Sequence, residues 1–290
     1  MARSHPPSAG DPLREQLARN SSPYADPLAR VAWDRLSLED WWLPPEALSL
    51  HGLETFAALP EPRRRALSHY EFLHTVEMGL WLEGLFMERL TRSMRAGRDN
   101  LPRLIYHLHE LREESGHSLM FLHLIQHAGL PRPPLRQGGL RLLALLARAT
   151  PFDSLPFWAA VLIGEEVPDR FNRYLKRHGH GLCPAILDVV RVHMMDEARH
   201  VTHALDTLSM HLSGTSARRR RLLRPMLGLL FRRFVDTFYY PAPGLYELAG
   251  LSPGKAWARA ARTNPVRRAF VRAQTESLRR LLARYGVSPD

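Results

Sequence analysis

The sequence predicts an all-α protein built on a four-helix bundle. Apolar residues recur at helical spacing over long stretches from about residue 62 onward, and no alternating run of β-branched residues is long enough for a sheet. An apolar stretch at 140–155 has the length of a crossover that joins two helical hairpins. The four bundle helices are predicted at 62–95, 100–128, 155–177 and 183–211.

Clusters of glycine, proline and serine separate the predicted helices. These breaks lie at 97–102, 129–139, 179–184 and 213–216. Two further helices, rich in arginine on one face, are expected at about 217–240 and 264–285 and should pack outside the bundle. We therefore expect one domain over residues 28–290, with the bundle core at about 62–212 and the extra helices at about 217–285.

The segments before the bundle carry weaker signals. Residues 1–27 are polar and rich in proline and serine, which predicts a disordered N-terminal arm. Residues 28–61, which include Trp33, Trp41 and Trp42, are expected to be irregular or to form short helices that wrap the bundle.

Composition excludes several classes of protein. Hydrophobic residues make up 45% of the 290 residues, which excludes a disordered chain, and the single cysteine, Cys183, excludes an internal disulfide or a cysteine-based zinc site. Any metal must therefore be held by histidine and carboxylate. The chain lacks an apolar span of membrane length and an apolar secretion signal, so a cytoplasmic protein with no membrane partner is expected.

The net charge of +11 is weak evidence for nucleic-acid binding. The 40 basic residues include only two lysines, Lys176 and Lys255, a skew that GC-rich codon usage would produce without selection for phosphate contacts. Nucleic acid is therefore an unlikely partner.

Three Glu-x-x-His motifs are the candidates for chemistry. Glu114–His117 and Glu197–His200 lie in otherwise apolar helices, and each helix follows one with a glutamate in an apolar stretch, namely Glu83 and Glu166. Both glutamate pairs are separated by 31 residues, so two hairpins related by a pseudo-twofold axis would place four glutamates and two histidines around one point. This pattern is typical of the di-metal carboxylate site of ferritin-like bundles.

Further residues extend the predicted site. His193 shares a helix face with Glu197 and His200, so it is expected as a third histidine ligand. Glu113 and Asp196 precede the ligand glutamates and are predicted to orient the histidine of the opposite motif.

Other residues of these helices are open to more than one interpretation. Glu165 competes with Glu166 for the ligand position, and the equal spacing favours Glu166. Glu71 and His74 are expected on a solvated face, whereas His107 and Glu110 share a face with Glu114 and either line the cavity or only pack.

Together these residues resemble the AurF-like di-iron oxygenases, the aminobenzoate and arylamine N-oxygenases. The resemblance covers roughly residues 40–212 and is carried by Glu83, Glu114-Ser-Gly-His117, Glu166 and His193-Met-Met-Asp-Glu197-Ala-Arg-His200. The histidine four residues before Glu197 is its most specific element. The resemblance implies a ferritin-like fold, two iron ions as cofactor, O2 as co-substrate and oxidation of an amine nitrogen.

The ligand pattern therefore predicts a non-haem di-iron oxygenase, and the resemblance implies a monooxygenase that oxidises an amine nitrogen in secondary metabolism. Expected partners are a small-molecule amine, an external electron donor and a second copy in a homodimer, and arginines within 218–233 could bind a substrate carboxylate. The alternatives are C–H hydroxylation or desaturation at the same site, an iron-handling ferritin-like protein, and a basic helical protein that binds nucleic acid.

Overall fold

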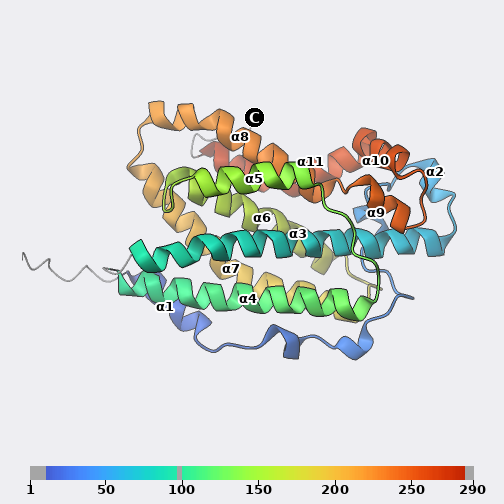
Figure 1. Ribbon diagram of the computed structural model, residues 1–290, viewed down its shortest axis with the longest axis horizontal. Coiled ribbons are helices and arrows are strands. Elements are labelled where there is room, and N and C mark those ends of the chain that lie inside the picture. The colour runs from blue at the N-terminus through green and yellow to red at the C-terminus, as the bar shows by residue number, and fades with distance from the viewer. Residues whose placement is uncertain (1–10, 97–99, 285–290) are drawn as a thin grey trace, which may run out of the picture.

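Four long helices form the centre of the molecule (Figure 1). The computed structural model describes residues 11–96 and 100–284, with side chains at 93–96 left out. Helices α3 (Glu61–Ala96) and α4 (Leu101–Ala128) form one hairpin, and α6 (Leu155–Arg177) and α7 (Pro184–Ser213) form the other. The observed bounds agree with the predicted helices to within two residues. The structure thus confirms the all-α, ferritin-like bundle, and the described residues contain no β-strand.

Local sequence sets the ends of these helices. The Asn100 side chain accepts a hydrogen bond from the backbone nitrogen of Arg103 at the start of α4, and Gly129, with φ 61°, ends that helix in the left-handed conformation. At the start of α6, the Ser154 side chain accepts a hydrogen bond from the backbone nitrogen of Phe157. Such caps satisfy backbone groups that a helix end would otherwise leave unpaired.

The predicted crossover contains a helix, α5 (Gln137–Ala149), which runs beside α3 and α8 (Figure 1). Helix α8 (Ala217–Tyr239) packs on α6 and α5, and α11 (Pro265–Arg284) packs on α6. The short helices α9 (Pro243–Leu248) and α10 (Gly254–Thr263) connect α8 to α11 along the chain. As predicted, these helices lie outside the bundle, but Phe231, Phe234 and Phe238 of α8 are buried against it.

The prediction of a disordered arm over residues 1–27 is wrong for its second half, and residues 1–10 lie outside the described residues. Helix α1 (Pro12–Ser21) packs along α4, where Leu17 and Ala18 bury against Tyr106. Asp11 caps this helix and Pro12 occupies its first turn. The sequence therefore contains residues typical of a helix N-terminus, although the segment as a whole is polar.

Short segments cover the bundle between α1 and α3, as predicted. They are the 3₁₀ turns η1 (Pro27–Arg30), η2 (Trp33–Arg35) and η3 (Pro45–Ala47) and the single-turn helix α2 (Glu54–Ala57). Trp41 forms an isolated parallel bridge with Leu182. None of the described helices is both long and apolar enough to cross a membrane.

The expected solvated face at Glu71 and His74 is also wrong, because both side chains are buried. The Glu71 carboxylate accepts hydrogen bonds from the Ser49 backbone nitrogen at 3.0 and 3.1 Å and from the Ser49 hydroxyl. The His74 Nε2 lies 3.0 Å from the carbonyl oxygen of Thr237. Segments before and after the bundle thus cover this part of α3, which its own periodicity could not reveal.

Candidate metal centre

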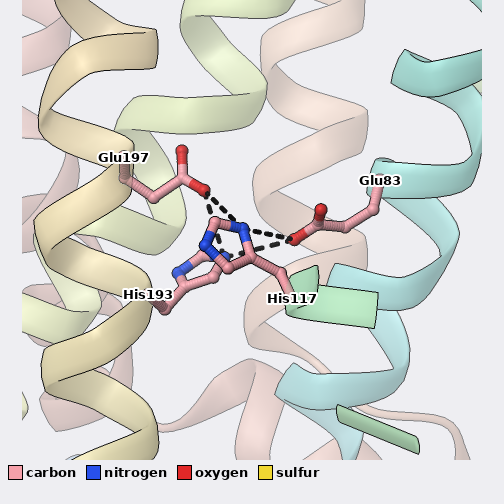
Figure 2. A group of neighbouring side chains, drawn as sticks. All are labelled: Glu83, His117, His193 and Glu197. Carbon is pink, nitrogen blue, oxygen red and sulfur yellow. Dashed lines mark hydrogen bonds and ion pairs between the residues drawn. The ribbon is translucent and has the colours of Figure 1, made fainter. Parts of the chain in front are cut away.

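Four predicted ligand residues meet inside the bundle as a first group, Glu83, His117, His193 and Glu197 (Figure 2). They come from α3, α4 and α7, and their nearest ligand atoms all lie within 4.8 Å of one another. His193 Nε2 is 3.2 Å from Glu83 Oε1 and 3.3 Å from Glu197 Oε1. His117 Nδ1 is 3.5 Å from the same Glu197 oxygen.

A second group contains Glu114, Glu165, Glu197 and His200, from α4, α6 and α7. His200 Nδ1 lies 3.1 Å from Glu114 Oε1 and 3.4 Å from Glu197 Oε2. Glu197 belongs to both groups and presents a different oxygen to each. The structure therefore brings six of the seven predicted ligand residues together in two adjacent groups.

The seventh residue, Glu166, lies outside both groups, and Glu165 takes its place. Glu166 Oε2 accepts a hydrogen bond from Arg170 Nε at 2.9 Å, and the Arg170 side chain is 40% exposed. The connection between α6 and α7 is longer than that between α3 and α4. The glutamates of the second hairpin that enter the site, Glu165 and Glu197, are therefore 32 residues apart, whereas the first hairpin has a spacing of 31. The choice of Glu166 by equal spacing is thus wrong.

Glu113 and Asp196 lie where the sequence predicted them. His200 Nε2 is 3.0 Å from Glu113 Oε2, and His117 Nε2 is 3.2 Å from Asp196 Oδ2, so each carboxylate contacts the histidine of the opposite motif. Arg199 donates hydrogen bonds of 2.7 Å to both carboxylates. These contacts turn the Nδ1 atoms of the two histidines toward the glutamates.

Sequence reasoning missed Asn172, which orients the third histidine. Its amide nitrogen lies 3.0 Å from His193 Nδ1, which leaves Nε2 facing Glu83 and Glu197. Asn172 follows Glu165 by seven residues on α6, so the helical repeat that contains the correct glutamate also contains this asparagine.

The buried acids shift one another's protonation. Burial raises the pKa of Glu83 and of Glu165 well above the usual range, and neighbouring glutamates raise both further. Burial alone would lower the pKa of His117, but its contacts with Asp196 and Glu114 raise it to about 9. These shifts favour protons on part of the cluster, and divalent cations could displace such protons.

The donor atoms fit metal ions. Several have no hydrogen-bond partner among the described residues although they are fully buried, namely Glu83 Oε2, Glu114 Oε1, His117 Nδ1, Glu197 Oε2 and His200 Nδ1. Buried polar atoms are normally paired, since each unpaired one costs about 1–3 kcal/mol. Carboxylates and imidazoles in this number are ligands for two divalent transition ions, and the four glutamates would neutralise their charge.

An apolar cavity of about 40 Å³ adjoins the first group. Besides Glu83, Glu114, Glu165 and His193, its wall contains mainly apolar side chains from α3, α6, α7 and α8, among them Phe72, Val76, Val190, Phe234 and Phe238. A second cavity of about 60 Å³ shares Leu82, Phe86 and Glu165 with the first. The volume of the first cavity is enough for a few water molecules.

Comparison with known proteins places this centre in a family. The family model for P-aminobenzoate N-oxygenase AurF matches residues 9–286. An uncharacterised protein of Mycobacterium tuberculosis, Rv0885, is 25% identical over 240 residues, which cover 80% of this chain and 68% of the relative. The uncharacterised Mycobacterium bovis protein Mb0909 matches to the same extent.

Solved structures share the fold. A mutant R2-like ligand-binding oxidase with an anaerobically reconstituted Mn/Fe cofactor superposes with a TM-score of 0.54 at 16% identity, over 99% of this chain and 95% of the other. Another mutant, with an aerobically reconstituted Fe/Fe cofactor, gives a TM-score of 0.53 at 17% identity over the same shares. The family match and the two ligand groups support a di-metal oxidase.

Proposed function

The chain belongs to the P-aminobenzoate N-oxygenase AurF family, and from this premise we propose that it is a di-iron oxygenase that oxidises the nitrogen of a small amine. The observation that carries the proposal is the pair of ligand groups that share Glu197 and adjoin an apolar cavity. A binding protein has no need of such an arrangement, in which buried acids and an apolar cavity lie side by side.

The protein's own residues have separable tasks in this proposal. The first group would hold one iron ion and the second group the other, and Glu197 belongs to both groups. When bound, the ions would activate dioxygen, with the electrons provided by an external donor. Glu113 and Asp196 keep the imidazoles of His200 and His117 oriented, and Asn172 does so for His193.

The cavity wall favours an amine whose carbon part is uncharged. Among the described residues, no arginine or lysine lines this cavity, and α8 contributes Phe234 and Phe238 rather than an arginine of 218–233. The expectation that those arginines bind a substrate carboxylate therefore finds no support. Thr75 and Asn172 are polar groups of the wall that could orient an amino group, while the phenylalanines exclude water from the reaction.

The reaction needs a source of electrons. Conversion of an amine and dioxygen to a hydroxylamine and water consumes two electrons and two protons. We therefore propose an external electron donor as a partner. The homodimer and the cytoplasmic location expected from the sequence are also part of the proposal. Iron is the proposed metal, and a manganese–iron pair is the competing composition.

Single-turnover oxidation with isotopically labelled dioxygen tests this function. The iron-loaded, chemically reduced protein is mixed with a panel of anilines and alkylamines, with and without a carboxylate, and the products are identified by mass spectrometry. We expect label on nitrogen, in hydroxylamine, nitroso or nitro products, and faster turnover of the uncharged amines. Label on carbon alone would assign a hydroxylase, and oxygen consumption with no labelled product from any amine would contradict the proposal.

A further inference from the structure

A second cluster of potential ligands lies one helical turn away from the metal centre. His107 and Glu110 are on α4, and Glu110 precedes Glu114 by four residues; His203 is on α7, three residues after His200. All three side chains are at most 1% exposed, and one donor atom from each lies within 4.8 Å of the others. We refer to them as the His–Glu–His cluster.

Two members of this cluster, Glu110 and His203, have buried polar atoms with no hydrogen-bond partner among the described residues. Glu110 Oε2 and both ring nitrogens of His203 are buried without a hydrogen-bond partner among the described residues, as is the neighbouring hydroxyl of Tyr106. The rings of Tyr106 and Trp158 pack against His203 with centroids 4.7 and 4.9 Å away. The Glu110 carboxylate and the His203 imidazole, enclosed by aromatic rings, would be costly to bury unless something bound them.

We propose that His107, Glu110 and His203 bind a third metal ion, a divalent transition metal such as zinc or iron. Two imidazoles and one carboxylate are the ligands that such ions prefer, and they leave coordination positions open. His203 Nδ1 and Glu110 Oε2 are 3.4 Å apart. Ligands bound at about 2.1 Å in tetrahedral or octahedral geometry are separated by about 3.0–3.5 Å, so the spacing suits an ion between them.

The nearby arginines do not prevent a cation from binding, because their charges are already paired. Arg14 lies 2.5 Å from Asp206 Oδ2, and Arg103 lies 2.6 Å from Asp153 Oδ1. Glu110 has no arginine partner among the described ion pairs, so a bound cation would supply its missing counter-charge. The competing explanation is a proton shared between Glu110 and His203, which requires no ion.

Metal counting distinguishes the two explanations. The metal-free protein is loaded anaerobically with cobalt(II), excess ion is removed, and bound cobalt is measured by elemental analysis together with the visible spectrum. We expect three cobalt ions per chain in the wild type and two in Glu110→Gln and in His203→Gln. Glu165→Gln is the matched control: it should lose metal from the di-metal centre while it keeps the cobalt that Glu110→Gln loses.

Anomalous diffraction at the cobalt edge provides a test that does not depend on the variants folding. A wild-type peak between His107, Glu110 and His203, separate from the peaks of the di-metal centre, is the expected result. Two ions in the wild type with no peak at the cluster would overturn the proposal and favour the shared proton. Three ions in wild type and Glu110→Gln alike would place the third ion elsewhere and also overturn it.

Discussion

Substitution of either member of the Glu165–Glu166 pair tests the most specific assignment in the metal centre. Glu165→Gln keeps the side-chain shape but removes a carboxylate from the second group, whereas Glu166→Gln changes only the contact with the half-exposed Arg170. Because the two residues are adjacent and of identical type, helix propensity and volume are matched between the variants. Only the position of the lost carboxylate differs.

The expected effect follows from linkage between metal binding and folding. Loss of a group that merely orients a ligand costs about 10–100-fold in metal affinity, so loss of a ligand should cost at least as much. That range corresponds to about 1.4–2.7 kcal/mol of metal-dependent stability. For a chain of this size, with a Tm change of about 2–4 °C per kcal/mol, the metal-induced rise in Tm should shrink by about 3–11 °C in Glu165→Gln.

The metal-free proteins provide an internal control. Burial raises the pKa of Glu165 well above the usual range, which favours the neutral acid in the metal-free protein, and glutamine has nearly the same shape as that acid. The Tm of Glu165→Gln without metal should therefore stay near that of the wild type. Glu166→Gln removes a charge from a helical i,i+4 pair whose arginine is 40% exposed, so it should cost about 0–1 kcal/mol with or without metal.

The assay is thermal unfolding with and without anaerobic iron(II), paired with measurement of bound iron. We expect Glu165→Gln to lose part of the metal-induced rise in Tm and part of its bound iron, and Glu166→Gln to keep both. The reasoning is refuted if Glu165→Gln retains the full shift while Glu166→Gln loses it, since the ligand would then be Glu166.

Three further predictions rest on buried contacts. Arg14→Ala removes hydrogen bonds to Asp206 and to a buried threonine and should lower the free energy of unfolding by about 2 kcal/mol, measured by urea denaturation; an unchanged midpoint would contradict it. Burial lowers the pKa of His74 to about 4, so the unfolded chain binds the proton first, and stability present above pH 6.5 is lost as the pH falls toward 4. The loss should reach about 3 kcal/mol and be smaller in His74→Gln, whereas equal losses in both proteins would show that His74 does not contribute. Asp196→Asn should weaken metal binding about 10–100-fold by releasing His117, and unaltered affinity in a metal competition assay would exclude that role.

The helices and most of the ligands could be predicted because both depend on local periodicity. Long amphipathic stretches with capping residues specify the bundle helices nearly to their ends, and glutamates and histidines inside apolar helices stand out as groups that need partners. The contacts of Glu113 and Asp196 followed from the same helical repeat, since each adjoins a ligand glutamate.

Features that depend on packing between distant segments could not be predicted in this way. Whether Glu165 or Glu166 faces the centre depends on the length of the α6–α7 connection and on the rotation of α6, which spacing alone does not define. The burial of Glu71 depends on Ser49, and Tyr246 in turn contacts that serine 2.9 Å away. These contacts are long-range, so no pattern within α3 contains them.

The contribution of α8 to the cavity separates the residues that shape the cavity from the residues that could bind metal. Phe234 and Phe238 form part of the cavity wall, yet α8 supplies no residue to either ligand group. Substitutions in this helix can therefore reshape the space for a substrate while the redox chemistry stays intact. Evolution could diversify the substrates of such a scaffold through its C-terminal part, and protein engineering could start from the same two positions.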